Sequence, residues 1–313
     1  LLIVKIAPKL FLRENAEIHF ERFIQDHNKQ YANEEEKQAR FEIFIENLER
    51  ANFQNQQSEH AVFGITRFSD LTPEEFVRQF TGLVHTPPSN FTGTECTVVS
   101  DSQIPNYNAP ESFDWRQHNA VTRVKNQDSC GGCYAFSASG NIEAQYAIKH
   151  GILLELSEQQ TVDCDKYSNG CQGGFMTEPV TFFKDLQSNY PYVGRKQACQ
   201  FSPGKAAVRL ADYIVKVLTL NLFLLLCLLG VKATSFHNYH LGILSDQMCN
   251  SGSVNHAVLL VGYGTENGIP YWTIKNSWGE GFGEVGYIRI QRGERASSCG
   301  MMNNGFMASS SVV

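Results

Sequence analysis

Cys133 is the residue in this chain whose surroundings point most clearly to chemistry. It stands at the predicted start of a helix, six residues after Gln127 and three after Cys130. A helix N-terminus carries a partial positive charge that favours a thiolate over a thiol. An amide side chain such as that of Gln127 can donate a hydrogen bond to a developing oxyanion. The same run also fits a dithiol redox pair or half of a zinc site, so other parts of the chain must decide.

A thiol nucleophile needs a base, and the base needs a group that orients it. His256 begins an apolar run that predicts a strand, and Asn276 directly follows the next predicted strand. Two neighbouring strands would place these side chains next to each other. Alone, each residue is more often structural than catalytic, and it is their combination with Cys133 that favours nucleophilic catalysis.

Length, charge and cysteine content limit the class of protein. The chain has 313 residues, 42% of them hydrophobic, which is enough for about two domains with buried cores. A net charge of −6 argues against nucleic acid as the main partner. Nine cysteines indicate an oxidising compartment, so we expect a lysosomal or secreted protein. Residues 1–14 are interpreted either as the remnant of a signal peptide or as a ragged N-terminus.

The elements expected around these residues change in type along the chain. Residues 15–82 are charged and helical in pattern, with an apolar stripe through Phe41, Phe44, Ile45, Leu48 and Ala51 and a capping box beginning at Thr72. Residues 85–106 lack periodicity and are interpreted as a linker. Helices are predicted over 133–150, ending at Gly151, and after Ser157. Strands are predicted over 257–263, 271–275 and 285–290, so two subdomains with a cleft between them are expected.

The chain resembles the papain family of cysteine peptidases over roughly residues 17–313. Three segments carry the resemblance: Gln127 with Cys130–Ser137, Asn255–Val258 with Val261–Gly264, and Lys275–Gly279. The segments Gly170–Gly174 and Asp114–Arg116 agree with it. The resemblance implies an α+β, papain-like fold in which a helical subdomain and a β-barrel-like subdomain flank a cleft, preceded by a helical propeptide domain.

The resemblance also implies a role for each site residue. Cys133 is expected to be the nucleophile, His256 the general acid/base and Asn276 the group that orients the imidazole. Gln127 and the backbone amide of Cys133 would form the oxyanion hole, and Trp278 would shield the His–Asn hydrogen bond. A cationic neighbour and the helix dipole can lower a thiol pKa to about 3–4. No cofactor or metal is expected, because a second CxxC or paired His is missing.

Substrate contacts and disulfides follow from the same resemblance. Gly173 and Gly174 would lie along the bound peptide, while Phe175, Met176 and Val254 would line the main selectivity pocket. Because all three are apolar, we expect an endopeptidase that prefers a bulky hydrophobic residue two places before the scissile bond. The implied disulfides are Cys130–Cys171, Cys164–Cys199 and Cys249–Cys299, which leave Cys96 and Cys227 unpaired. A partner for Cys130 other than Cys133 speaks against the redox pair.

The N-terminal region resembles the family's inhibitory propeptide. Two motifs carry this similarity: Glu36, Arg40, Phe44, Asn47, Ala51 and Asn55, then Gly64, Thr66, Phe68 and Asp70. The expected organisation is a propeptide domain over 15–82, a cleft-spanning linker over 83–108 and a peptidase domain over 109–313, with maturation cleavage between about Thr97 and Ala109. Acid would release the propeptide by protonating carboxylates such as Asp70. The expected partners are peptide substrates, the chain's own propeptide and cystatin-type inhibitors, with the enzyme a monomer that binds no nucleic acid.

The chain departs from the family pattern at several positions. Tyr134 and Gly132 stand where Trp and Ser are usual, and Asp128 replaces a Gly beside the oxyanion Gln, where a carboxylate could weaken the hole or shift the pH optimum. The apolar run 217–231 replaces a polar helix and a strand. It fits a buried helix or strand, a membrane span or an error in the gene sequence. If this run damages the β subdomain, the alternative function is a catalytically impaired papain-like binding or inhibitory protein.

Overall fold

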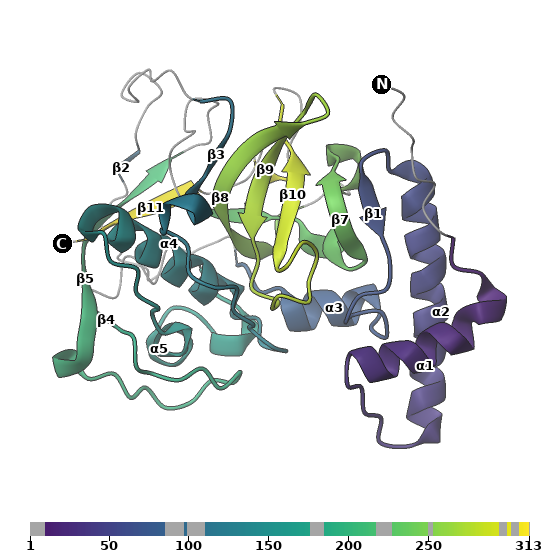
Figure 1. Cartoon of the computed structure of the whole chain (residues 1–313). Helices are drawn as coiled ribbons and strands as arrows, with labels where there is room; N and C mark the ends of the chain where they lie inside the picture. Colours follow the sequence, from purple (N-terminus) through teal and green to yellow (C-terminus); the bar gives the residue numbers. More distant parts are fainter. Residues whose placement is uncertain are drawn as a thin grey trace.

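The computed structural model describes residues 10–84, 97–98, 110–175, 185–216, 227–249, 253–293, 299–301 and 307–312. Three parts lie side by side in Figure 1. The N-terminal helices α1 and α2 form one side, a strand-rich part lies in the middle, and α4 and α5 form the other side. This mixture of helices and strands confirms the expected α+β class.

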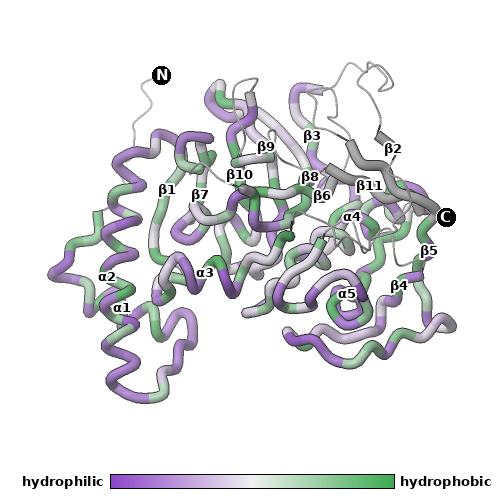
Figure 2. Tube along the Cα trace, turned by 180° about the vertical axis from the view of Figure 1, so that it is seen from behind, coloured by the Kyte–Doolittle hydropathy of each residue, from purple (hydrophilic) through white to green (hydrophobic). Residues whose placement is uncertain are grey.

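The N-terminal region is built on the long helix α2 (Glu34–Gln57), across which α1 (Ala16–Asp26) packs. Asn33 caps α2 by accepting a hydrogen bond from the backbone N–H of Glu36 at 2.9 Å. Hydrophilic and hydrophobic residues alternate along both helices (Figure 2), and the hydrophobic faces meet. The buried cluster between them consists of Ala16, Phe20, Phe23, Phe44, Ile45 and Leu48. The predicted apolar stripe of α2 is therefore confirmed, with Phe41 half-buried at its edge.

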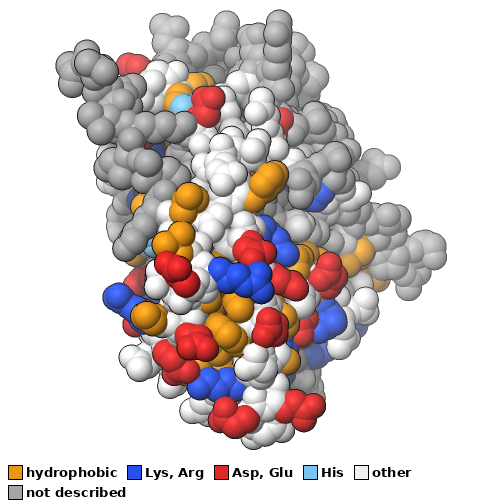
Figure 3. Space-filling model, turned by 90° about the vertical axis from the view of Figure 1, so that its right-hand side faces the viewer, with side chains coloured by type: hydrophobic (Ala, Val, Ile, Leu, Met, Phe, Trp, Pro, Cys, Tyr) orange, Lys and Arg blue, Asp and Glu red, His pale blue; other side chains and the backbone are white. Residues whose placement is uncertain are grey.

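Polar side chains of α2 hold the segment that follows it. Asn47 donates to the backbone carbonyls of Ser69 and Leu71, both at 2.8 Å, and Asn55 exchanges two hydrogen bonds with the backbone of Phe63. These hydrogen bonds fix the position of the segment, because moving it would leave the two buried amides without partners, which is costly. Figure 3 shows the opposite, outer surface of α1 and α2, where acidic and basic side chains surround a few apolar ones.

Two short elements join the N-terminal region to the rest of the protein. Strand β1 (Ala61–Phe63) pairs antiparallel with β7 (Tyr239–Leu244) and so extends the central sheet. Helix α3 (Pro73–Phe80) begins with the predicted capping box, in which Thr72 and Glu75 bond each other's backbone N–H groups. The N-terminal region therefore has a fixed position against the strand-rich part.

The two helices beyond residue 130 form as predicted. Helix α4 (Cys133–His150) ends at Gly151, which adopts a left-handed conformation with φ of 70°. Helix α5 (Glu158–Cys164) is capped by Ser157, whose side chain accepts from the backbone N–H of Gln160 at 3.0 Å. The first three turns of α4 are almost entirely buried, so the thiol at its start is held by a rigid element.

The strands form one continuous, strongly curved sheet in the order β1-β7-β10-β9-β8-β6-β11-β5-β2, with β3 on β8 and β4 on β5. Their bounds, beyond those of β1 and β7, are β2 (Thr97–Val98), β3 (Phe113–Asp114), β4 (Asp185–Gln187), β5 (Ala206–Lys216), β6 (Cys227–Val231), β8 (His256–Glu266), β9 (Ile269–Lys275), β10 (Tyr287–Gln291) and β11 (Met307–Val312). The expected start of the last predicted strand at Val285 is wrong. Val285 and Gly286 have positive φ and form a turn, so β10 begins at Tyr287.

The apolar run 217–231 contains a strand at its C-terminal end. Residues 217–226 lie outside the described residues, but β6 pairs with β8 on one side and β11 on the other. Leu229 and Val231 are fully buried, which supports the interpretation of this part as a core strand. Within the described ranges, none of the helices combines the length and hydrophobicity that a membrane span requires.

Part of the linker expected over 85–106 also forms regular structure. Within it, β2 pairs in parallel with Ile214 and Val215 of β5. The sequence pattern could not show this pairing, because the partner strand lies more than a hundred residues further along the chain.

Candidate active site

Cys133 occupies the first position of α4, directly after Gly132, and is completely buried. The backbone amides of Cys133 and Tyr134 point at the thiol, as expected for the open N–H groups of a first helical turn. The backbone of Ala257 also contacts it, which places the thiol beside the start of β8. The helix predicted from local signals therefore brings its N-terminus against the predicted histidine strand.

His256 and Asn276 meet because β8 and β9 pair in antiparallel register, with Leu259 opposite Lys275. The imidazole Nε2 of His256 and the side-chain Oδ1 of Asn276 are 2.8 Å apart. The other ring nitrogen, Nδ1, has no hydrogen-bond partner among the residues that the structure describes. Asn276 therefore fixes one nitrogen of the imidazole and leaves the second one available.

Trp278 covers the His–Asn pair. Its ring lies nearly parallel to the imidazole of His256, with centroids 4.6 Å apart, and is itself fully buried. Phe68 and Phe76, both from the N-terminal region, pack edge-on against Trp278 at centroid distances of 5.3 and 5.2 Å. Water is thereby excluded from the His–Asn hydrogen bond, which strengthens it.

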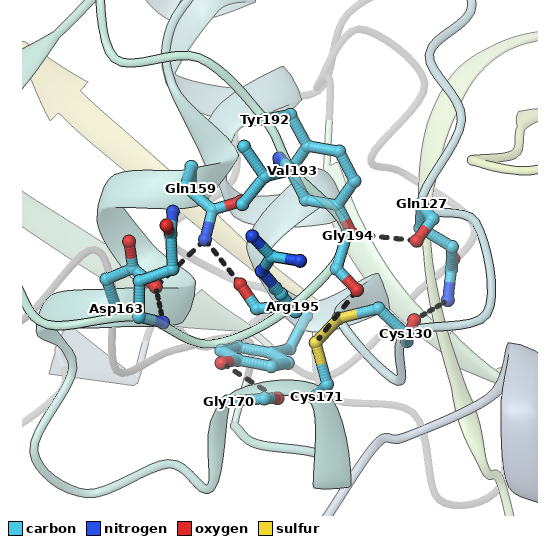
Figure 4. Close-up of a disulfide and its surroundings, with 12 residues drawn as sticks. Gln127, Cys130, Gln159, Asp163, Gly170, Cys171, Tyr192, Val193, Gly194 and Arg195 are labelled. Carbon is cyan, nitrogen blue, oxygen red and sulfur yellow. Dashed lines mark hydrogen bonds between the residues drawn. A yellow bond between two sulfur atoms is a disulfide. The ribbon is translucent and has the colours of Figure 1, made fainter.

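Gln127 is held at both ends beside the thiol. Its side-chain Oε1 accepts from the Ser277 hydroxyl at 2.6 Å, and its Nε2 donates to the Cys130 carbonyl at 2.8 Å. The Tyr192 hydroxyl donates to the Gln127 backbone carbonyl at 2.7 Å (Figure 4). Ser277 and Tyr192 were not among the residues that the sequence singled out. Ser277 could have been suspected because it directly follows Asn276, whereas nothing near Tyr192 in the sequence marks it.

The three disulfides expected from the resemblance are all present. They are Cys130–Cys171, Cys164–Cys199 and Cys249–Cys299. The first ties the loop that carries Gln127 to the short 3-10 turn Gly170–Gln172 (Figure 4). Cys133 remains a free thiol, so the redox interpretation is wrong. Cys96 and the side chain of Cys227 lie outside what the structure describes.

A buried ionic cluster beneath the site joins α4 to β9. Lys125 Nζ contacts carboxylate oxygens of Glu143 at 2.6 Å and Glu158 at 2.5 Å. Thr122 bridges the cluster to the sheet, because it donates to Glu143 at 2.6 Å and accepts from Lys275 Nζ at 2.9 Å. Glu143 could have been noticed in the sequence as the one acidic residue of a helix whose first three turns consist mainly of small and apolar residues. The cluster fixes the helix that carries the thiol relative to the strand that precedes Asn276.

The segment after α3 runs directly over the thiol. The N–H groups of Gly82 and Leu83 donate to the Asn255 carbonyl at 3.1 and 3.0 Å. Leu83 pairs in parallel with Gly174, through Val84 N to Gly174 O at 3.0 Å and Gly174 N to Gly82 O at 2.9 Å. Two residues before Gly82, the Phe80 carbonyl accepts from Gln127 Nε2 at 3.2 Å and from Trp278 Nε1 at 3.0 Å. The N-terminal region therefore covers Cys133, Gln127, Gly174 and Trp278.

Burial under this segment reverses the expected charge state of the site. It raises the pKa of the Cys133 thiol to about 12, although the surrounding backbone amides favour the thiolate. Burial also lowers the pKa of His256 to about 4, against the effect of the Asn276 hydrogen bond. The lowered thiol pKa that is expected of the active Cys–His pair is therefore not found in the covered form, because desolvation outweighs the helix dipole.

Two of the predicted substrate residues, Gly174 and Val254, lie beside Leu83 of the N-terminal region. A Cβ atom built on Gly230 would lie 2.9 Å from Leu83 Cδ2 and 3.0 Å from Val254 Cγ2, so these side chains fill the space above that glycine. Phe175 and Val254 are buried. Gly173 has φ of 110°, which only glycine adopts readily, and its N–H donates to the Gly170 carbonyl. Met176 lies outside the described residues.

Comparison with known proteins agrees with the fold. Residues 109–309 match the family described as papain family cysteine protease, and residues 20–76 match the cathepsin propeptide inhibitor domain (I29). The chain therefore belongs to the papain family and is a cysteine peptidase made with an inhibitory propeptide. Within that family it is a cathepsin L-like proenzyme.

Individual relatives cover the chain almost completely. The viral cathepsin of Mamestra configurata nucleopolyhedrovirus is 41% identical over 322 residues, which cover 99% of this chain and 93% of that protein. The digestive procathepsin L2 proteinase from Tenebrio molitor larval midgut superposes with a TM-score of 0.85 at 31% identity, covering 95% of this chain and 99% of that one. The recombinant stem bromelain precursor superposes with a TM-score of 0.81 at 32% identity, covering 95% and 98%.

Proposed function

We propose that this zymogen matures to an endopeptidase in which Cys133 is the nucleophile, His256 the general acid/base and Asn276 the orienting group. The observation that carries the proposal is the 2.8 Å contact between His256 Nε2 and Asn276 Oδ1 beside a free thiol at a helix start. This contact leaves imidazole Nδ1 to exchange a proton with the thiol. No observation favours the catalytically impaired alternative.

The geometry supports a two-step acyl transfer. The Cys133 thiolate attacks the peptide carbonyl, and the resulting oxyanion accepts from Gln127 Nε2 and the Cys133 backbone N–H. His256 then protonates the leaving amine, and water hydrolyses the thioester with His256 as base. In the zymogen, Gln127 Nε2 already donates to a carbonyl, that of Phe80. The propeptide thus occupies the proposed oxyanion donor of Gln127.

Acid is proposed to release the propeptide, because ion pairs hold it together. Asp70 is nearly buried between Lys29 Nζ at 2.6 Å and the Tyr31 hydroxyl at 3.1 Å. Glu75 forms a bidentate pair with Arg40 at 2.6 and 3.1 Å. Protonating either carboxylate leaves a partly buried cation without its partner, which destabilises the domain.

The Glu75→Gln substitution tests this acid sensitivity. Hydrogen bonds from Arg40 hold the pKa of Glu75 below its ordinary value. A lowered carboxyl pKa stabilises the folded state above the ordinary value of about 4.3, and this contribution is lost as pH falls through the folded-state pKa. In a Cys133→Ala background, which prevents self-cleavage, we expect Glu75→Gln to lower the Tm by about 2–4 °C at pH 7. That difference should shrink as the pH falls below the ordinary carboxyl pKa of about 4.3 and Glu75 becomes protonated.

The glutamine side chain can still close the capping box, so charge is the main change. Glu46→Gln on the exposed face of α2 is the matched control and should leave the Tm unchanged at both pH values. A Tm difference for Glu75→Gln that stayed constant down to pH 3 would contradict the assignment.

Substrate selection is proposed to depend on the apolar space that Leu83 and Val254 fill in the zymogen. After processing, we expect kcat/KM to be at least about tenfold higher for peptides with Leu or Phe two places before the scissile bond than for those with Asp or Arg there. Burying a charge without a partner costs more free energy than burying one methylene group gains. Fluorogenic peptides that differ only at this position measure the ratio. Equal rates for Leu and Asp would contradict this account of the pocket.

We also propose that the enzyme is a secreted or lysosomal monomer that cystatin-type inhibitors block. Its three disulfides support an oxidising compartment, because such bonds persist outside the cytosol. A covered cleft that accepts a strand of the propeptide also offers a surface for an inserted inhibitor segment.

A further inference from the structure

The loop beside the oxyanion Gln carries an acidic residue in a constrained conformation. Asp128 has φ of 52°, a left-handed conformation that asparagine, aspartate and glycine tolerate best. Its Oδ1 accepts from the Asn126 side-chain Nδ2 at 2.7 Å, and its backbone N–H donates to Asn126 Oδ1 at 3.2 Å. These two hydrogen bonds fix the orientation of the Asn126 side-chain amide and so the position of its oxygen.

A cation of the propeptide occupies this place in the zymogen. Arg67 Nη1 donates to Asn126 Oδ1 and to the Trp278 backbone carbonyl, both at 3.2 Å. Asp128 is the carboxylate whose charge favours the charged form of this half-buried guanidinium. We call Asn126 Oδ1, the Trp278 carbonyl and the Asp128 carboxylate together the cation corner. Each of the three presents negative charge or the negative end of a dipole.

The cation corner belongs to the mature domain and is held independently of the propeptide. Asn126 and Trp278 face each other in an antiparallel bridge. Gln127 N donates to the Ser277 carbonyl at 2.8 Å, and Gly279 N donates to the Lys125 carbonyl at 3.0 Å. These bonds remain when the propeptide leaves. Arg67 leaves with the propeptide, so the acceptors that it used become available to another cation.

The course of the propeptide shows on which side of the thiol the cation corner lies. Phe80 contacts Gln127 and Trp278, Gly82 passes over Cys133, and Leu83 pairs with Gly174. In the proposed function, the end at Gly174 and Val254 takes the residues before the scissile bond. The opposite end, with Trp278 and the cation corner, therefore takes the residues that leave with the amine product.

We infer that the cation corner of the mature enzyme selects substrates with Lys or Arg among the residues directly after the scissile bond, and that Asp128 determines this preference. The inference rests on the proposed function and adds a specificity that the apolar pocket does not provide. Arg67 shows the recognition mode, in which one guanidinium nitrogen bridges a backbone carbonyl and the Asn126 amide oxygen, whose amide nitrogen donates to the Asp128 carboxylate.

The test uses processed enzyme and internally quenched peptides with a common sequence up to the scissile bond. The peptides carry Arg, Lys or Gln at the first, second or third position after it. At the best of these positions, we expect kcat/KM for Arg to exceed that for Gln by about fivefold, the upper end of the range for a largely exposed ion pair. Asp128→Asn should bring this ratio close to one. Glu111→Gln, which removes an exposed carboxylate elsewhere in the mature domain, should retain the wild-type ratio.

The ratio of kcat/KM for Arg to kcat/KM for Gln is taken within each enzyme, so any general effect of Asp128 on the oxyanion hole cancels. Asp128→Gly provides a second variant, because glycine accepts the positive φ as readily as asparagine does. Raising the salt concentration should lower the wild-type ratio and leave the Asp128→Asn ratio unchanged. A wild-type ratio near one at all three positions, or a ratio unaffected by both Asp128 variants, overturns the inference while the proposed function stands. Failure of wild type to hydrolyse any peptide would overturn both.

Discussion

Cys133→Ala is expected to reduce kcat/KM of the acid-treated protein by about 10⁴-fold or more, and His256→Ala by a similar factor. In the proposed mechanism the two residues act as a unit, so removing either one would remove covalent catalysis and leave only binding and the oxyanion donors. The measurement is hydrolysis of a fluorogenic peptide with Leu two places before the scissile bond. Because both variants lack self-processing, maturation must be carried out by added wild-type enzyme, which is then removed.

Ser139→Ala is the matched control for the cysteine variant. Ser139 lies on the same helix and is equally buried, and its Oγ has no partner within the described residues, so its loss removes one atom from α4 without altering the site. We expect full activity from this variant. If Cys133→Ala retained more than about a hundredth of wild-type activity, the nucleophile would have to be another residue.

Gly82→Ala is expected to abolish the latency of the zymogen. A Cβ atom at residue 82 would lie 2.2 Å from the Gly131 carbonyl oxygen and 2.8 Å from its carbon, closer than real contacts allow. Both atoms belong to the backbone next to the Cys130–Cys171 disulfide, so the propeptide strand must move instead. Lifting this strand breaks its hydrogen bonds to Asn255 and Gly174 and uncovers the thiol.

The measurement for Gly82→Ala is labelling of the unprocessed chain by an epoxysuccinyl thiol inhibitor at pH 7. We expect complete labelling of this variant under conditions in which wild-type zymogen reacts at least about a hundredfold more slowly. Gly64→Ala is the control, because a Cβ there meets only Phe11 Cζ at 3.8 Å, an ordinary contact. Equal protection of the Gly82→Ala and Gly64→Ala chains would refute the claim that the strand at residue 82 maintains latency.

Features with local signals could be predicted from the sequence. Helix α4 ends at Gly151, α3 begins with its capping box, and α5 follows Ser157, because each signal lies within a few residues of the element it defines. The proximity of His256 and Asn276 was also predictable, since adjacent strands along the chain usually pair.

Features that depend on distant segments could not be predicted from the sequence alone. Strand β5 pairs with β11 and β2, which lie about a hundred residues away on either side of it. The anchoring of Gln127 by Tyr192 depends on a loop that no periodic pattern marks. The raised pKa of the Cys133 thiol in the zymogen could not be predicted either. Helix position is a local property, but burial under residues 80–84 is a tertiary one, and it has the larger effect on the thiol pKa.

The central claim is that Cys133 is the nucleophile and that the propeptide conceals it. Mass spectrometry after treatment with an epoxysuccinyl inhibitor, before and after acid processing, tests this claim most directly. The account predicts that the inhibitor's mass is added to the peptide containing Cys133 only after processing, and that His256→Ala suppresses this modification. A fully processed enzyme in which Cys133 remains unmodified, or in which another cysteine is labelled instead, would contradict it.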